Sequence, residues 1–343
     1  MISKTRHNLL FVVLAMGTAA LFLADVSLGA VTIPTVDVVK SLTGGTASKD
    51  TWEYIIMNYR LPKAITAILA GIGLSVSGLL MQTLFRNPLA GPYVLGLSSG
   101  SSLGVAFVIL GSSLIPGLAG TLLSSSYGIM LASCLGSLAV LLAVLVVSGK
   151  LRDTSAILIV GLMFGSFTNA FVGVLTYFSS AEQLQKFTFW SLGNLGNLSW
   201  ASVAVLTTSV LVGLLLALSG IKPLDALLLG ENYAKSLGVN YKKAQLTVIV
   251  ATSVLAGSIT AFAGPIAFIG LAVPHMAKLA FQTSNHRILF AATILLGASI
   301  MLFCDMLSQF PGTDVSLPIN AITSLIGAPV VIWLLLRKHQ SLS

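Results

Sequence analysis

Ten long apolar stretches constrain this sequence more than any other feature. A helix needs about 20 mostly apolar residues to cross the hydrocarbon core of a bilayer, with a range of about 17 to 25. Only 8% of the 343 residues are charged, against about 25% in a typical soluble domain. The sequence therefore predicts an all-α membrane protein with about ten transmembrane helices. The stretches are 8–30, 64–84, 93–110, 127–148, 155–178, 201–219, 245–263, 266–281, 288–310 and 319–336.

The distribution of Lys and Arg predicts the orientation of the chain. An even number of spans places both termini on one side of the membrane. With the N-terminus inside, 13 basic residues fall on the inner side and 5 on the outer side. Cytoplasmic loops carry an excess of Lys and Arg, so we expect both termini in the cytoplasm. The five outer basic residues are Lys40, Lys49, Arg60, Lys63 and Lys186.

Charge and cysteine usage argue against a nucleic-acid partner, a disulfide framework and a metal site. The formal net charge of +8 raises the alternative of an anionic partner such as nucleic acid. Proteins that bind nucleic acids gather their basic residues in a patch or stripe, and this sequence has no such stripe with interleaved aromatic residues. Cys134 and Cys304 both lie in apolar stretches, where a thiol packs as a small hydrophobic group. We therefore expect no nucleic-acid partner, no disulfide framework and no metal site.

Two polar segments interrupt what is otherwise a single transmembrane domain over residues 1–343. The basic start and apolar centre of the first stretch resemble a signal peptide, but its apolar run is longer than a signal-peptide core, so we interpret it as an uncleaved first helix. Segment 31–63 falls on the outer side and segment 220–245 on the inner side. Neither resembles a linker to a soluble domain.

The stretch "RNPLAGPYVLGLSSG" at 86–100 breaks the apolar pattern. Asn87-Pro88 ends a helix, because proline lacks the backbone donor and disfavours helix in the residue before it. Glycine and serine are dense from Gly91 to Gly104. Such small residues allow close packing of membrane helices, and they also leave room for a weakly polar pathway. Both interpretations stay open on sequence alone.

A short sequence similarity between two parts of the chain suggests an inverted repeat. "LAGPYVLGL" at 89–97 and "FAGPIAFIGL" at 262–271 each follow an apolar run. The predicted topology places the first near the inner face and the second near the outer face, as in an inverted-topology repeat. Coincidence is the alternative, because the match is short and its spacing slips by one residue.

Three ionisable residues lie inside the predicted spans: Asp25, His275 and Asp305. Such residues are costly in a membrane and are functional candidates by default. Asp25 and Asp305 fall near outer helix ends, where we expect their carboxylates to reach water. A lone histidine such as His275 is more often structural. No chain of buried acidic residues suggests a proton relay, which argues against an ion-coupled carrier.

The chain carries no motif for ATP hydrolysis. The P-loop pattern is absent, since Gly149-Lys150 lacks the upstream glycine and the following hydroxyl residue. Segment 220–245 instead predicts two short helices, "PLDALLLG" and "ENYAKSLG", each closed by a glycine. Glu231 suits the start of the second helix because of the helix dipole. Apolar residues at helical spacing could dock in a partner's groove or lie on the lipid surface. They are Leu224, Leu227, Leu228, Ala234 and Leu237.

Four blocks of the sequence resemble the FecCD family, the permease subunits of type II ABC importers for iron-siderophores, haem and cobalamin. The blocks lie at 60–104, 227–239, 263–278 and 317–336, in the family's order. The resemblance implies a homodimer of ten-helix subunits in a bacterial inner membrane. It also implies two cytoplasmic ATP-binding subunits and an external substrate-binding protein, lipid-anchored or periplasmic. It implies no cofactor.

The resemblance also assigns roles to residues of this chain. It implies an inner gate at Asn87, Leu89, Thr154 and Ser155. It implies contact with the external binding protein through Arg60 and Lys63, which we expect to be exposed. The spacing of "ENYAKSLG" fits the helices that couple such permeases to their ATPase. The coupling residues it implies are Leu227, Leu228, Gly230, Glu231, Ala234, Leu237 and Gly238.

Two outer positions depart from the family pattern. Gln309 stands where the family commonly has a basic residue, and Ser316 and Asn320 replace the Glu and Gly of Glu-Leu-Pro-x-Gly. The contact with a binding protein is therefore expected to differ in detail.

The resemblance narrows the cargo to three kinds of molecule and leaves two other classes of protein as rivals. We expect a ferric siderophore as cargo, with cobalamin or haem as alternatives. A stand-alone secondary carrier or channel is the rival class, which the inverted repeat would also allow, and a membrane enzyme is a third.

Overall fold

The computed structural model describes residues 4–111, 125–148, 154–196, 198–309 and 316–340. These residues form helices and, apart from one isolated bridge between Gln309 and Ser316, no β structure. The predicted all-α membrane fold is confirmed. The helices are α1 (Lys4–Ser27), α2 (Thr35–Leu42), α3 (Asp50–Ile55), α4 (Leu61–Leu84), α5 (Leu97–Ile109), α7 (Ser126–Ser148), α8 (Thr154–Tyr177), α9 (Ala181–Ser191), α10 (Trp200–Ser219), α11 (Ile221–Leu227), α12 (Glu231–Ser236), α13 (Tyr241–Ala263), α14 (Ile269–Phe281), α15 (His286–Ser308) and α16 (Ile319–Gln340).

Each of the ten predicted spans contains one apolar helix. Within the described ranges, seven helices are long and apolar enough to cross a membrane, and α5, α14 and the apolar part of α16 are shorter. A helix rises about 1.5 Å per residue, so the 13 residues of α5 or α14 reach about 20 Å of a core that is about 30 Å thick. Helices α5 and α14 alone are therefore too short to cross this core.

Side-chain caps mark the starts of several helices, and the residue types explain where these helices begin. Short polar side chains at the N-cap satisfy backbone N–H groups that have no partner inside the helix. The N-caps of α10, α13 and α15 are Ser199, Asn240 and Asn285. Ser180 starts α9 with a capping box, in which its side chain and that of Gln183 each bond the other's backbone N–H.

Helix α4 is the central element of the molecule, and most of its residues are buried. It packs against α10, α13, α14 and α15. Glycines allow the closest of these contacts, since a Cβ on Gly71 would overlap the backbone of Gly297 and a Cβ on Gly78 would overlap the carbonyl of Gly270. Small residues thus bring α4 into backbone contact with α15 and α14.

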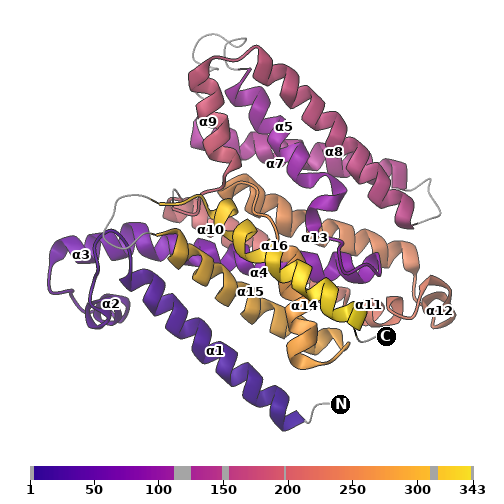
Figure 1. The fold of residues 1–343 in the computed structure, drawn as a ribbon, viewed down its shortest axis with the longest axis horizontal. Coiled ribbons are helices and arrows are strands. Elements are labelled where there is room, and N and C mark those ends of the chain that lie inside the picture. Colours follow the sequence, from indigo (N-terminus) through magenta and orange to yellow (C-terminus); the bar gives the residue numbers. More distant parts are fainter. Residues whose placement is uncertain (1–3, 112–124, 149–153, 197, 310–315, 341–343) are drawn as a thin grey trace.

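The helices form two groups that α13 joins (Figure 1). One group contains α5, α7, α8 and α9, and the other contains α1, α4, α10 and α14–α16, while α13 contacts both α4 and α7. A Cβ on Gly100 would lie 2.6 Å from the carbonyl oxygen of Gly136 on α7, and one on Gly104 would overlap Ala132. The packing interpretation of the small residues is therefore confirmed for Gly100 and Gly104.

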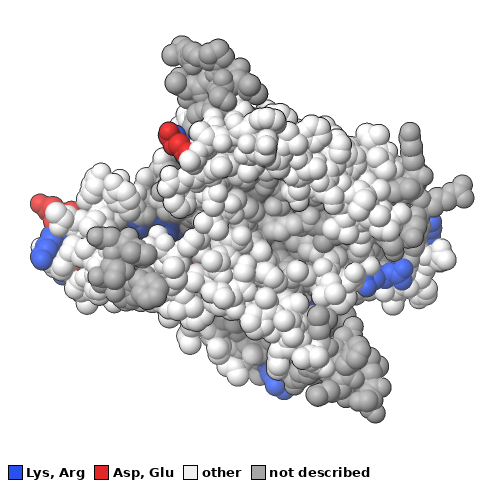
Figure 2. Space-filling model, turned by 45° about the horizontal axis from the view of Figure 1, so that its top comes forward, with Lys and Arg blue, Asp and Glu red and all other residues white. Residues whose placement is uncertain are grey.

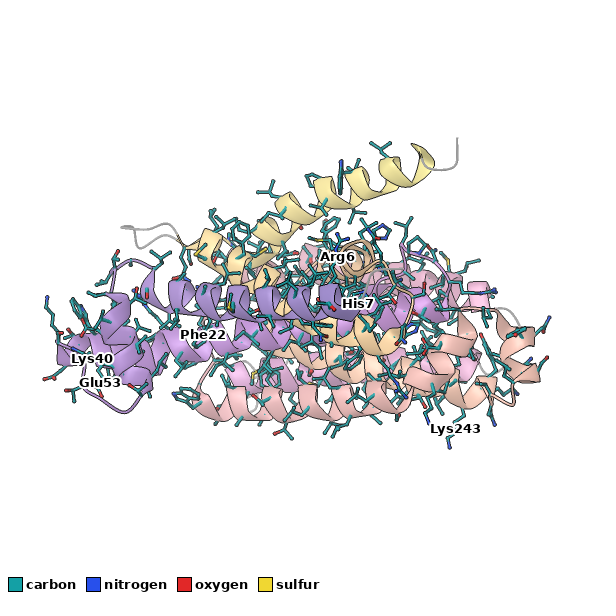
Figure 3. All side chains as sticks on the ribbon, turned by 90° about the horizontal axis from the view of Figure 1, so that it is seen from below. Arg6, His7, Phe22, Lys40, Glu53 and Lys243 are labelled. Carbon is teal, nitrogen blue, oxygen red and sulfur yellow. The ribbon has the colours of Figure 1, made fainter. Side chains whose placement is uncertain are left out.

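The two polar segments lie at opposite ends of the molecule. Helices α2 and α3 lie at one end and α11 and α12 at the other, with the start of α1 and the end of α16 on the side of α11 and α12 (Figure 1). Figure 3 shows Lys40 and Glu53 at the first end and Lys243 at the second. In Figure 2 the charged side chains lie toward the margins and the broad middle of the face is uncharged. This arrangement suits a multi-pass membrane protein.

The segment predicted at 31–63 is folded, and a π-helical turn at Ile56–Arg60 joins its last helix to α4. Asp37 holds the segment together by accepting hydrogen bonds from the backbone N–H and the hydroxyl of Ser48, at 3.0 and 2.6 Å. These bonds lower the pKa of the Asp37 carboxyl, because they stabilise its charged form. The indole of Trp200 also donates to the carbonyl of Met57 at 3.0 Å, which ties the segment to α10.

Candidate functional site

The chain turns sharply where α4 ends, next to the Asn-Pro pair. Arg86 has a left-handed backbone with φ 47°, and its N–H donates to the carbonyl of Thr83 at 3.2 Å. The N–H of Asn87 donates to the carbonyl of Gln82 at 3.1 Å. This pair of bonds is a Schellman motif, which satisfies the last carbonyls of a helix. Pro88 then prevents the helix from resuming, so the predicted helix end is confirmed.

The predicted gate residues lie around this turn and at the start of α8. The side chain of Asn87 accepts the N–H of Leu89 at 2.9 Å, and the Leu89 side chain is 46% exposed. Thr154 and Ser155 are the first residues of α8, but their side chains lie outside what the structure describes. The structure thus presents Leu89 as an exposed apolar residue at the break, and the gate itself stays a prediction.

The two "AGP" segments, which precede α5 and α14, contact each other inside the bundle. The phenolic oxygen of Tyr93 accepts the N–H of Ile266 at 3.3 Å, and a Cβ on Gly270 would lie 2.7 Å from Cδ of Pro92. Non-helical backbone at membrane depth is tolerated only where protein or a water-filled cavity satisfies it. The two segments therefore pack against each other, and Tyr93 of the first satisfies a backbone N–H of the second. The inverted repeat that their sequences suggest stays a prediction.

Side chains from two other helices complete this region. The amide of Gln82 donates to the carbonyl of Leu271 at 3.0 Å, close to the proline that interrupts α14. Asn320, one of the departures from the family pattern, accepts the N–H of Ala267 at 3.0 Å. Both side chains bond backbone groups at or near the start of α14. Sequence reasoning gave Gln82 no role and linked Asn320 only to the contact with the binding protein, because the partners of both side chains are distant in the chain.

Helix α8 exposes polar side chains near its middle, and the sequence analysis did not single them out. Ser166 and Asn169 are both exposed, although α8 is apolar enough to span a membrane. A Cβ on Gly173, one turn further on, would meet nothing within 4 Å. Polar side chains at membrane depth usually face protein or water and avoid lipid. This face of α8 is therefore a candidate pathway or subunit contact.

The predicted coupling segment forms two short helices, α11 and α12, as expected. Leu228, Leu229, Tyr233 and Leu237 are exposed, the last at 60%. The expectation that Leu224, Leu227 and Ala234 also lie on the docking face is wrong, because they are 1%, 3% and 0% exposed and pack into the chain's own core. Gly230 and Gly238 both have positive φ, 107° and 78°, which suits glycine. The side chain of Glu231 lies outside what the structure describes.

Segment 220–245 also contacts the end of α4 and the start of α15. Asp225 on α11 bonds His286, whose ring in turn contacts Thr83 on α4. A Cβ on Gly230 would lie 3.3 Å from a guanidinium nitrogen of Arg86. Sequence reasoning missed Asp225, which lies in the second half of α11, and His286, the first residue of α15, because their contact joins segments that are distant in the chain.

The predicted docking pair on the other side is engaged within the chain. Arg60 donates to the carbonyls of Val26 and Ser27 at 2.7 and 2.8 Å and also to that of Val31. Lys63 forms an ion pair with Asp305 at 3.0 Å and is only 19% exposed. The expectation of two fully exposed charges is therefore wrong, because partners at or just after the end of α1 and near the end of α15 pair with them and leave both only half-buried.

The expected contact of Asp25 and Asp305 with water is also wrong. Asp25 is 3% exposed and Asp305 is 1% exposed, and the amide of Gln309 donates to both, at 3.3 Å each. Gly29, with φ 147°, lets the chain pass close by, since a Cβ there would lie within 3.0 Å of Arg60 and Gln309. We call Asp25, Arg60, Lys63, Asp305 and Gln309 the outer cluster.

Two further candidates have no role at this stage. His275 is half-buried in α14, directly after Pro274. Within the described ranges, no group of three or more His, Cys, Asp and Glu residues could hold a metal ion. The features that stand out are therefore the broken spans, the exposed face of α8 and the two ends of α4.

These features define a class: a multi-pass helical transport protein with broken spans that meet inside the bundle. Comparison with known sequences identifies the family. The profile of the FecCD transport family matches residues 17–337. The chain belongs to this family, whose members are permease subunits of type II ABC importers.

Named relatives match nearly the whole chain. The hemin transport system permease protein HmuU of Yersinia pestis is 34% identical over 331 residues, covering 96% of this chain and 97% of the relative. The vitamin B12 import system permease protein BtuC of Vibrio parahaemolyticus is 35% identical over 290 residues, covering 84% and 85%. A solved structure described as an inward-facing metal-chelate type ABC transporter has a TM-score of 0.84 at 27% identity, covering 96% and 99%. The cargoes in these descriptions differ.

Proposed function

We propose that this chain is the membrane-spanning subunit of an importer that carries an iron chelate, specifically a ferric siderophore, across a bacterial inner membrane. Two copies form the pathway, and two cytoplasmic ATP-binding subunits drive it. An external substrate-binding protein delivers the cargo. Cobalamin and haem are the alternative cargoes, since relatives of similar identity are described as carrying vitamin B12 and hemin.

One observation carries the proposal of a two-subunit pathway. Asn169 is exposed in the middle of α8, where contact with lipid would leave its side-chain amide without a hydrogen-bond partner, whereas the exposed hydroxyl of Ser166 already donates to the carbonyl of Leu162 at 3.1 Å. A second copy of the chain, related by a twofold axis, would place the same face opposite itself. The result is a weakly polar wall along the axis, which suits passage of a large polar chelate.

The exposed residues of the coupling segment support a separate ATPase. Leu228, Leu229, Tyr233 and Leu237 are exposed apolar residues on α12 or directly after α11 and α12, at one end of the protein (Figure 1). Short helices that present apolar anchors fit the helix-in-groove mode of binding. The sequence itself contains no P-loop, so the proposed partner supplies ATP hydrolysis.

The outer cluster is the proposed contact for the binding protein. Arg60 and Lys63 are only half-buried, so an acidic group on a partner can approach them from outside. Because both already have partners within the chain, an incoming carboxylate must share or replace those contacts. Such contacts at an interface rim mainly speed association, and their effect falls as salt rises.

Uptake by reconstituted liposomes tests this function. The chain, its ATPase and its binding protein are assembled with ATP inside or outside the liposomes, and labelled ferric siderophore, haem and cobalamin are compared. We expect ATP-dependent movement of the siderophore that requires the binding protein. Uptake driven by an ion gradient without ATP would contradict the proposal, and ATP-driven uptake of cobalamin or haem alone would correct the cargo. Asn169→Leu should reduce uptake, whereas Leu211→Ala, on an exposed face of α10, should not.

A further inference from the structure

Three side chains from three helices form a continuous hydrogen-bonded chain at the inner end of the bundle. His286, the first residue of α15, is 1% exposed. Its Nδ1 lies 2.6 Å from Oδ1 of Asp225, and its Nε2 lies 2.8 Å from the hydroxyl of Thr83. The backbone N–H of His286 also donates to Oδ1 of Asp225 at 3.1 Å. We call Asp225, His286 and Thr83 the link.

The chemistry of these groups fixes most of the hydrogen positions. An ionised carboxylate can only accept, so Nδ1 of His286 carries a hydrogen and donates to Asp225. The hydroxyl of Thr83 also lies 3.0 Å from the carbonyl of Leu79. If Nε2 is protonated, the hydroxyl accepts from it and donates to Leu79. If Nε2 is not protonated, the hydroxyl donates to the ring, so the link persists in both protonation states.

The position of Asp225 strengthens its hydrogen bonds to the start of α15. Its carboxylate lies at the N-terminus of that helix, where the backbone N–H groups and the helix dipole favour negative charge. It bonds the ring and the backbone of the same residue, His286. Hydrogen bonds to charged groups are stronger than neutral ones, and the ring is buried. The Asp225–His286 contact therefore holds α11 firmly to the start of α15.

The other end of the link lies one turn from the break in α4. The carbonyl of Thr83 accepts the N–H of Arg86, so Thr83 belongs to the Schellman turn that precedes Leu89. A second contact runs beside it, because Gly230 faces the guanidinium of Arg86. The segment with the exposed apolar surface is thus joined to the predicted gate through direct side-chain contacts.

We infer that the link of Asp225, His286 and Thr83 transmits movement of the coupling segment to the end of α4, and so couples ATP-driven motion to the inner gate. The inference rests on the proposed function, since it requires an ATPase on segment 220–245. Asp225, His286 and Thr83 are positioning residues, which act through the backbone turn that carries Leu89. Rigid contact at each step makes α11, α15 and the end of α4 move together.

Spin-label distances across the dimer test the link without knowledge of the cargo. Labels are placed at Leu89→Cys in a chain with Cys134→Ala and Cys304→Ala, assembled with its ATPase in liposomes. Pulsed electron paramagnetic resonance measures the Leu89–Leu89 distance without nucleotide and with ATP and vanadate. ATP hydrolysis is measured on the same samples. We expect the distance to change with nucleotide in the otherwise unaltered chain.

Matched variants then separate the link from general packing. Thr83→Val removes the hydroxyl and keeps the shape, whereas Thr83→Ser keeps the hydroxyl. Thr293→Val removes a buried hydroxyl of α15 that has no hydrogen-bond partner among the described residues. Asp225→Ala breaks the other end of the link at a residue whose side chain is 44% exposed, so the fold should tolerate it.

We expect Thr83→Val to reduce the fraction of dimers that change distance by about threefold to tenfold, the loss of one such hydrogen bond. Asp225→Ala should reduce this fraction at least as much, because it removes two bonds to His286, and ATP hydrolysis should be retained in both variants. Thr83→Ser and Thr293→Val should behave like the unaltered chain. Full nucleotide-dependent movement in both Thr83→Val and Asp225→Ala would overturn the link but leave the proposed function intact. No movement and no bound ATPase in the unaltered chain would overturn both.

Discussion

Removing the charge of Lys63 should destabilise the protein far more than removing a surface charge. Lys63 is paired with Asp305 at 3.0 Å, and the side chain of Asp305 is 1% exposed. At that separation two unit charges attract by about 5.5 kcal/mol when the effective dielectric constant is about 20. Lys63→Met leaves the Asp305 carboxylate buried without its cation, a change that typically costs about 3–5 kcal/mol. Ser308 and Gln309 still donate to that carboxylate, so we expect about 3 kcal/mol, near the lower end.

Equilibrium unfolding in mixed detergent micelles measures this cost as a change in the free energy of unfolding. The control is Lys186→Met, which breaks an exposed ion pair with Glu182 at 2.8 Å and should change little. A second variant, Lys63→Met with Asp305→Asn, removes both charges and should recover most of the loss, because no uncompensated charge is left buried. If Lys63→Met unfolds like Lys186→Met, the outer cluster does not depend on this ion pair and the reasoning is wrong.

Three further changes test other parts of the account. Leu237→Asp should leave membrane insertion unchanged, since Leu237 is 60% exposed. It should abolish substrate-stimulated ATP hydrolysis, because a carboxylate in an apolar groove of the ATPase is costly. Normal stimulation of ATP hydrolysis would exclude Leu237 from the contact. Leu89→Cys should crosslink to its copy across the dimer axis, as judged by gel electrophoresis; no crosslink in any nucleotide state would place the gate elsewhere. Gly78→Ala should strongly reduce the yield of folded protein, because its Cβ would overlap the carbonyl of Gly270. Gly17→Ala is the control and should be neutral, since a Cβ there meets nothing within 4 Å. Equal yields of the two variants would contradict the close approach of α4 and α14.

The spans and the break could be predicted because both depend on local sequence. Apolar length determines which segments cross the membrane, and every predicted span contains a helix. The Asn87-Pro88 break follows from the covalent structure of proline. The resemblance of four blocks, at 60–104, 227–239, 263–278 and 317–336, then carried the family assignment, which the family profile confirms.

The contacts between distant residues could not be predicted in this way. Asp25 and Asp305 lie near helix ends, a position that suggests water, yet Lys63 and Gln309 cover them from other parts of the chain. Periodicity placed Ala234 and Leu237 among the same docking residues, but only the fold shows that Ala234 packs inward and Leu237 outward. Side-chain direction relative to the rest of a bundle depends on tertiary packing, which a one-chain pattern of apolar residues does not encode.

Purification of the chain with its bound partners tests whether this protein is a transport subunit driven by a separate ATPase bound to segment 220–245. The chain is extracted from its native membrane in mild detergent and weighed intact by native mass spectrometry. We predict a complex of two copies of this chain with two copies of a P-loop ATPase, and loss of the ATPase from the Leu237→Asp variant. A chain that carries no ATPase and still moves its cargo in response to an ion gradient would contradict the account.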